Sequence, residues 1–203
     1  MPHDNPIQQL THEHHHILQV VHGLSAIDQE LAAGNRPDPA RLRTIVAFMR
    51  EFADQCHHAK EEAILFPAME DKGVPHGGCP LEALRREHVL GRERVGALAA
   101  AIDALERGDN DAPAALHAAI AALQQLYPNH IWKEDQMVFP MAERLFTPAE
   151  LDALNARFEQ AEIELGQDHD RYVAFAEDMA ALLGADTGAA THTAGGHLHP
   201  PAH

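Results

Sequence analysis

The sequence predicts an all-α protein: an up-down-up-down four-helix bundle with an additional C-terminal fifth helix. Aromatic residues make up only 5% of the 203 residues, while Ala and Leu are abundant, which favours helix over sheet. Apolar residues recur every three, four or seven positions over long stretches, the period of an amphipathic helix. Short Gly- and Pro-containing segments separate these stretches, and short loops between long helices favour antiparallel neighbours.

The first four helices are delimited by these helix-breaking segments. Gly34–Pro39 ends the first helix, and a loop from Lys72 to Pro80 follows the second. Residues 107–111 (Arg-Gly-Asp-Asn-Asp) separate the third from the fourth. The predicted helices span residues 7–33, 40–71, 81–106 and 113–145.

A fifth helix follows a clear start signal. Residues 147–150 (Thr-Pro-Ala-Glu) provide an N-cap, a proline at the first helical position and a capping-box glutamate. We expect this helix to run to about Leu183 and to pack outside the bundle or cap one end. From residue 184 the composition shifts to Gly, Ala, Thr, His and Pro, which predicts a disordered tail. The predicted domain is therefore residues 1–183, with a tail over 184–203.

Two stretches of the chain, residues 57–67 and 130–140, repeat one pattern. Each begins with His, places Glu four residues later and ends in Phe-Pro, where the proline should kink or end its helix. Each also follows a Glu-His pair, at residues 13–14 and 87–88. The intervals from the histidine of the pair to that of the repeat are 43 and 42 residues. The chain therefore looks like a duplicated helical hairpin.

This pattern predicts a site for a pair of metal ions. An α-helix turns by about 100° per residue, so a His and a Glu four residues apart lie on one face. Imidazole suits iron, zinc and copper, and a carboxylate can bridge two ions. Two bridging carboxylates, two His per ion and an oxo or hydroxo bridge leave an octahedral metal one open position for O2, NO or peroxide. The predicted metal ligands are His14, His57, Glu61, His88, His130 and Glu134.

The choice of two histidines rests on alignment of the repeats. His14 is chosen from residues 12–16 because it aligns with His88, and its neighbours His12, His15 and His16 are expected to be solvated. His58 precedes Glu62 by four residues, as His57 precedes Glu61. Ile131 replaces His58 in the second repeat, so we predict that His58 lies beside the ligands or at the surface.

Other nearby side chains remain alternatives. Glu62 and Asp135 would replace Glu61 and Glu134 as ligands if each helix were rotated by one residue. Tyr127, one turn before the second repeat, is expected to line the pocket or to be a core tyrosine with a hydrogen bond. Residues expected to be core are Cys56, Leu65, Phe66, Trp132, Val138 and Phe139.

Composition excludes several classes of partner. The formal charge of -16 would repel a phosphate backbone or an anionic membrane surface, so neither is expected. Cys56 and Cys79 alone make no disulfide framework. No signal peptide is visible, and no apolar stretch reaches the ~20 residues that span a bilayer. A reducing cytoplasm is the expected compartment.

The two repeats and the run from Glu87 to Arg92 resemble the hemerythrin-like family, whose members carry the HHE cation-binding signature. The resemblance covers about residues 7–183. It implies a non-haem di-iron centre inside a four-helix bundle, with two iron ions rather than zinc. It also implies contact with O2, NO or reactive oxygen species.

The resemblance departs from oxygen-carrying hemerythrins at two positions. Those proteins have a fifth His one turn after the first His of the third helix, where this chain has Arg92. They also place the last carboxylate five residues after its His, which here is Asp135. These departures argue against reversible oxygen carriage. Arg92 is expected to reach a carboxylate near the ligands or to lie on the surface.

Three functions fit these observations. The first is a di-iron protein that binds O2, NO or peroxide, for sensing, binding or detoxification. The second is an enzyme for peroxide breakdown or iron-sulfur cluster repair under oxidative or nitrosative stress. The third is storage or buffering of iron or zinc. The sequence favours the first, leaves open whether the protein turns over a substrate, and names no protein partner.

Overall fold

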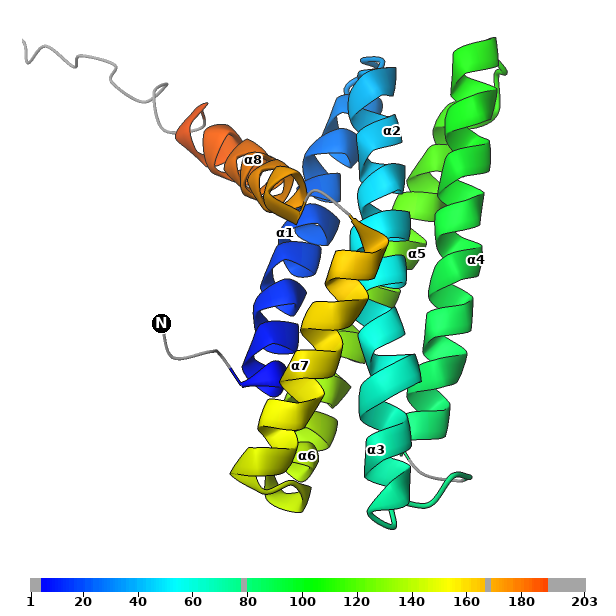
Figure 1. Cartoon of the computed structure of the whole chain (residues 1–203). Helices are drawn as coiled ribbons and strands as arrows, with labels where there is room; N and C mark the ends of the chain where they lie inside the picture. The colour runs from blue at the N-terminus through cyan, green and yellow to red at the C-terminus, as the bar shows by residue number, and fades with distance from the viewer. Residues whose placement is uncertain (1–4, 78–79, 167–168, 190–203) are drawn as a thin grey trace, which may run out of the picture.

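The computed structural model describes residues 5–77, 80–166 and 169–189, and these form six helical segments without a strand (Figure 1). Four long segments pack as an antiparallel bundle, with the chain reversing direction at each connection (Figure 1). The predicted all-α fold is therefore confirmed. None of the described helices is long and apolar enough to cross a membrane.

The four bundle helices agree with the predicted ones within a few residues. The first begins with a capping box between Asn5 and Gln8, and the second with the N-cap Asp38 before a proline at N1. Two of the four contain π-helical turns, labelled η. The bundle consists of α1 (Pro6–Ala32); the continuous helix of α2 (Pro39–Phe48), η1 (Met49–His58), η2 (Glu61–Leu65) and α3 (Phe66–Asp71); α4 (Pro80–Arg107); and the continuous helix of α5 (Ala112–Lys133), η3 (Glu134–Val138) and α6 (Phe139–Leu145).

The prolines of the two repeats do not end their helices. Pro67 and Pro140 each follow a π-helical turn, η2 or η3. Proline cannot donate to the carbonyl four residues earlier, and its ring clashes with that carbonyl. A π turn changes the local hydrogen bonding to i→i+5, so the helix continues past the proline. Glu61 and Glu134 are the first residues of these two turns.

Two hydrophobic clusters fill the bundle, one toward each end. The larger includes Leu24 of α1, Phe48 of α2 and Leu98 of α4. The smaller includes Leu10 of α1 and Phe66 of α3. On α1 and α4 the buried polar residues fall between the two clusters, so a polar layer crosses the middle of the bundle.

The predicted fifth helix is two helices, α7 (Pro148–Leu165) and α8 (His169–Ala189). The capping box of Thr147 and Glu150 starts α7 as expected. Gly166 ends it with a φ of 59°, a left-handed conformation that glycine adopts without strain. α7 runs along the outside of the bundle, and α8 packs against α1 at an angle to it (Figure 1). α8 extends beyond the predicted end at Leu183, and residues 190–203 of the predicted tail lie outside the described residues.

Candidate metal centre

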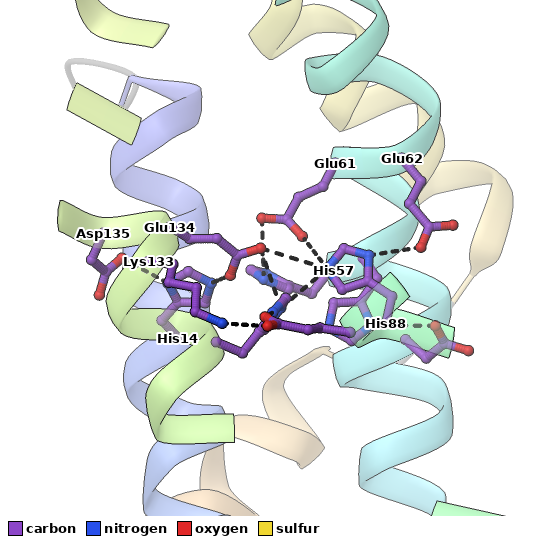
Figure 2. Close-up of polar contacts among 12 residues, drawn as sticks. His14, His57, Glu61, Glu62, His88, Lys133, Glu134 and Asp135 are labelled. Carbon is purple, nitrogen blue, oxygen red and sulfur yellow. Dashed lines mark hydrogen bonds and ion pairs between the residues drawn. The ribbon is translucent and has the colours of Figure 1, made fainter. Parts of the chain in front are cut away.

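All six predicted ligands meet in the polar layer, and His58 joins them. Figure 2 shows the side chains of His14, His57, Glu61, His88 and Glu134 gathered between the bundle helices. They come from all four bundle helices, and each is at most 3% exposed. Their donor atoms form two groups in which every atom lies within 4.8 Å of the others. The two-histidine group is His14, His57, Glu61 and Glu134, and the three-histidine group is His58, His88 and His130.

Glu61 and Glu134 connect the two groups. Glu61 Oε1 lies 3.7 Å from His57 Nε2, and Glu61 Oε2 lies 3.4 Å from His88 Nε2. Glu134 Oε2 lies 3.1 Å from His14 Nε2, and Glu134 Oε1 lies 3.2 Å from His130 Nε2. Each carboxylate therefore turns one oxygen toward each group, which is the arrangement needed to bridge two ions.

Four more carboxylates hold the outer nitrogens of these imidazoles. His57 Nδ1 lies 2.8 Å from Glu13 of α1, and His130 Nδ1 lies 3.0 Å from Glu87 of α4. With a carboxylate at Nδ1, the ring donates its proton there and keeps the Nε2 lone pair for the interior.

His88 of α4 and His14 of α1 are held at Nδ1 by carboxylates in the same way. His88 Nδ1 lies 2.7 Å from Glu62, and His14 Nδ1 lies 2.7 Å from Asp135. Neighbouring residues on an α-helix point about 100° apart, so the residue beside a ligand faces the next helix. The four contacts thus link each bundle helix to the next in a closed ring. Glu62 and Asp135 thus bond to histidines of other helices, while Glu61 and Glu134 face the interior.

His58 is also part of the centre. It is buried, its ring stacks on His88 at 3.9 Å between centroids, and its Nδ1 lies 3.3 Å from Asp54. The possibility that it lies at the surface is wrong. It belongs to η1, where i→i+5 bonding widens the turn and brings neighbouring side chains closer in angle. His57 and His58 can therefore both face the interior, which an α-helical reading does not predict.

Arg92 and Tyr127 lie beside the three-histidine group. Arg92 donates to Asp54 (Nε, 2.8 Å) and to Glu62 (Nη2, 3.0 Å), so it joins the carboxylates that hold His58 and His88. Tyr127 is buried and makes no hydrogen bond with the described residues; with His58 it lines a cavity of about 160 Å³. The prediction that Arg92 reaches carboxylates is confirmed, and Tyr127 lines this cavity rather than making the expected hydrogen bond.

The remaining predictions divide between core and surface. Leu65, Phe66, Val138 and Phe139 are buried as expected, and Phe139 stacks on His14 at 5.2 Å. The prediction of a core Trp132 is wrong, since its side chain is 60% exposed. It stands two residues after His130, about 200° around the helix from the interior. Among the other N-terminal histidines, His12 and His15 are exposed and His16 is partly buried, with its Nδ1 3.1 Å from Gln19 Oε1.

Cys56 is a buried neutral thiol. Burial raises its pKa to about 12, consistent with the predicted core role. Cys56, Glu13 and Glu162 also bring donor atoms together, but the ammonium of Lys60 contacts both carboxylates. The protein therefore supplies the positive charge at this third group.

Protonation differs across the centre. Burial lowers the pKa of His57 to about 4, against the opposing effect of Glu13, so this imidazole is neutral. Burial alone would lower the pKa of His14, but Asp135 and Glu134 raise it to about 9. Burial and the carboxylate of Glu134 raise the pKa of Glu61 well above its ordinary value. Burial acts in the same direction on Glu134, yet His130 and His14 outweigh it and hold the pKa of Glu134 well below its ordinary value.

The centre contains buried polar atoms whose contacts with one another, at 3.1–3.7 Å, do not have hydrogen-bond geometry. They are Nε2 of His14 and His57 and both carboxylate oxygens of Glu61 and of Glu134. Each such atom costs about 1–3 kcal/mol when left unpaired. Two bound cations would satisfy them all, and imidazole and carboxylate are donors that transition metals prefer. The residues present therefore fit a pair of metal ions.

Comparison with known proteins agrees with this geometry. The model of the hemerythrin HHE cation binding domain matches residues 5–142, which include all seven buried donors but neither α7 nor α8. No curated protein and no solved structure matches the chain. Because the matched region covers more than half of the sequence, the chain belongs to the hemerythrin HHE cation-binding family.

Proposed function

We propose that the protein binds two iron ions in this centre and, through them, a small ligand: O2, NO or peroxide. The observation that carries the proposal is the set of buried donors without hydrogen bonds, arranged around two carboxylates that face both groups. His14 and His57 would hold one ion and His58, His88 and His130 the other, with Glu61 and Glu134 shared.

The donor count favours iron over zinc. The two-histidine group has four protein donors. The three-histidine group would have five when Glu61 and Glu134, whose oxygens lie near His88 and His130, are shared with it. Zinc in closed protein sites is almost always four-coordinate, so five donors exceed its preference. Iron accepts six ligands, which leaves more open coordination at the two-histidine group. When bound, the ions would supply redox chemistry and open positions for the small ligand.

The protein itself contributes orientation and exclusion of water. The carboxylates at Nδ1 fix the tautomer of each histidine and the direction of its Nε2. The two hydrophobic clusters lie on either side of the polar layer along the bundle, which would limit the access of bulk water to a ligand bound there.

The test is reconstitution of the metal-free full-length chain with Fe(II), followed by metal analysis and visible spectroscopy. We expect two irons per chain and an absorption spectrum that changes when O2, NO or peroxide is added. Gas evolution on addition of peroxide would identify turnover in addition to binding. Tight binding of zinc with no stable iron-loaded form would contradict the proposal and favour metal buffering.

A further inference from the structure

α7 lies outside the region matched by the family model, yet it reaches the hydrogen bonds of the centre. Glu162 of α7 accepts from Lys60 Nζ at 2.5 Å and from Gln9 Nε2 at 2.6 Å. Lys60 is also bonded to Glu13, and Glu13 holds His57. A continuous chain of contacts therefore runs from α7 to a histidine of the two-histidine group.

Lys60 is unusually well enclosed for a lysine. Its side chain is 1% exposed, and its ammonium lies 5.7 Å from the ring centroid of Phe158, which is also on α7. A buried ammonium needs compensating charge, and here two carboxylates provide it. α7 thus supplies both the cover over Lys60 and its second carboxylate.

The equivalent contact in the second repeat lacks this cover. Lys133 matches Lys60 and bonds to Glu87, which holds His130. Its side chain is 38% exposed, and Glu87 is its one carboxylate partner among the described residues. The second repeat therefore pairs one lysine with one carboxylate, whereas the first pairs one lysine with two.

The second carboxylate on Lys60 affects the negative charge that Glu13 presents to His57. An ammonium shared between Glu13 and Glu162 neutralises neither carboxylate fully, so Glu13 keeps negative charge for the Nδ1–H of His57. A more negative partner at Nδ1 makes an imidazole a stronger donor to a metal.

We propose that Glu162 is a positioning residue for the two-histidine group: by sharing Lys60 it keeps Glu13 oriented on His57 and strengthens His57 as a metal donor. This inference rests on the proposed di-iron function. α7 would thus affect the properties of the centre and not only the packing of the bundle.

The test compares Glu162→Gln and Glu162→Ala with Glu159→Gln in the full-length protein. Glu159 is on the same helix and lines the same 440 Å³ cleft, but the carboxylate partners of Lys60 are Glu13 and Glu162. Two readouts are combined. Competition with a chelator gives the affinity for each of two Co²⁺ ions, and the reduction potential is measured on the iron-loaded protein.

We expect Glu162→Gln to lower the affinity for one of the two ions by about tenfold and to change the affinity for the other by less than twofold. The reduction potential should rise, because less negative charge then stabilises the oxidised ion. Glu162→Ala should have a larger effect and Glu159→Gln none. The melting temperature of the metal-free protein should change little.

Three results would overturn the inference. The first is unchanged affinity and potential in both Glu162 variants. The second is an equal loss of affinity for both ions. The third is a loss of affinity that follows a fall in the stability of the metal-free protein. A wild-type chain that binds fewer than two ions would instead refute the proposed function itself.

Discussion

The first repeat, residues 57–67, and the second, residues 130–140, place their shared side chains in the same way. His57 and His130 each turn Nε2 to the interior and Nδ1 to a glutamate of the preceding helix. Glu61 and Glu134 each begin a π-helical turn and face both histidine groups. The common scaffold thus explains two imidazoles, two carboxylates and their supports.

At the centre, the repeats differ in one residue and in the surroundings of another. His58 in the first corresponds to Ile131 in the second, so the first repeat sends an additional imidazole across to His88 and His130. Lys60 is enclosed by α7, while Lys133 is partly exposed. An approximately symmetric scaffold therefore carries an asymmetric centre, with two histidines on one side and three on the other.

Removal of a shared carboxylate should have the largest effect on this centre. In Glu134→Ala, the imidazoles of His14, His88 and His130 all lose the carboxylate that lies within 3.5 Å of their Nε2 atoms. We expect the metal content to fall from two ions per chain to one or none, measured by elemental analysis after gel filtration.

Glu143→Ala is the matched control, because Glu143 is an exposed glutamate of the same continuous helix. The control should retain two ions. A Glu134→Ala protein that also retains two ions with wild-type affinity would mean that the assigned ligands are wrong.

His58→Ile gives the first repeat the residue found at the matched position of the second, Ile131, and tests the origin of the asymmetry. The three-histidine group then keeps only two imidazoles, so one ion should bind more weakly while the other is unchanged. His15→Ile is the control, since His15 is exposed on α1. Titration with Co²⁺ against a chelator checks both; two affinities equal to those of the wild type would show that His58 is not a ligand.

His58 also marks the limit of what the sequence could predict. The spacing of His57 and Glu61 is a regular α-helical pattern, so it could be read directly. His58 lies in the π-helical segment η1, whose i→i+5 bonding the α-helical periodicity of the sequence does not report. Arg92 shows the same limit, because the sequence left open whether it meets carboxylates or solvent.

The break in the fifth helix and the exposure of Trp132 were within reach of sequence reasoning. Gly166 is a standard C-terminal helix signal, and Trp132 is on the opposite helix face from His130. The position of α7 against Lys60 could not be predicted, because nothing in the sequence pairs Glu162 with a residue 102 positions away.

Substitutions in the ring of supporting carboxylates should affect the two groups separately. Asp135→Asn weakens the support of His14, and Glu62→Gln weakens that of His88. Loss of such a partner typically costs 10–100-fold in metal affinity. We expect about a tenfold loss for a single ion in each variant. If either variant lowers the affinity for both ions equally, the two groups do not act as separate sites.

The smallest expected effect is a pH dependence of metal binding at the two-histidine group. In the metal-free protein the pKa of His14 is about 9, so this imidazole holds a proton at pH 7 that a metal must displace. His57, with a pKa of about 4, has no such proton to lose. The affinity of the two-histidine group should rise with pH from 7 to 9, by up to about tenfold per pH unit for one displaced proton, and level off above 9.

Zinc competition titrations at several pH values check this, with Asp135→Asn as the comparison. That variant removes a carboxylate that raises the pKa of His14, so its pH dependence should shift to lower pH. An affinity that is constant from pH 7 to 9 in the wild type would contradict the assignment of the proton to His14.

The most direct measurement is a crystal structure of the iron-loaded protein with anomalous diffraction recorded at the iron absorption edge. The arrangement of donors predicts two peaks between Glu61 and Glu134. One should lie within bonding distance of Nε2 of His14 and His57, and the other within bonding distance of Nε2 of His58, His88 and His130. A single peak, or iron bound away from these seven side chains, would contradict an asymmetric two-ion centre.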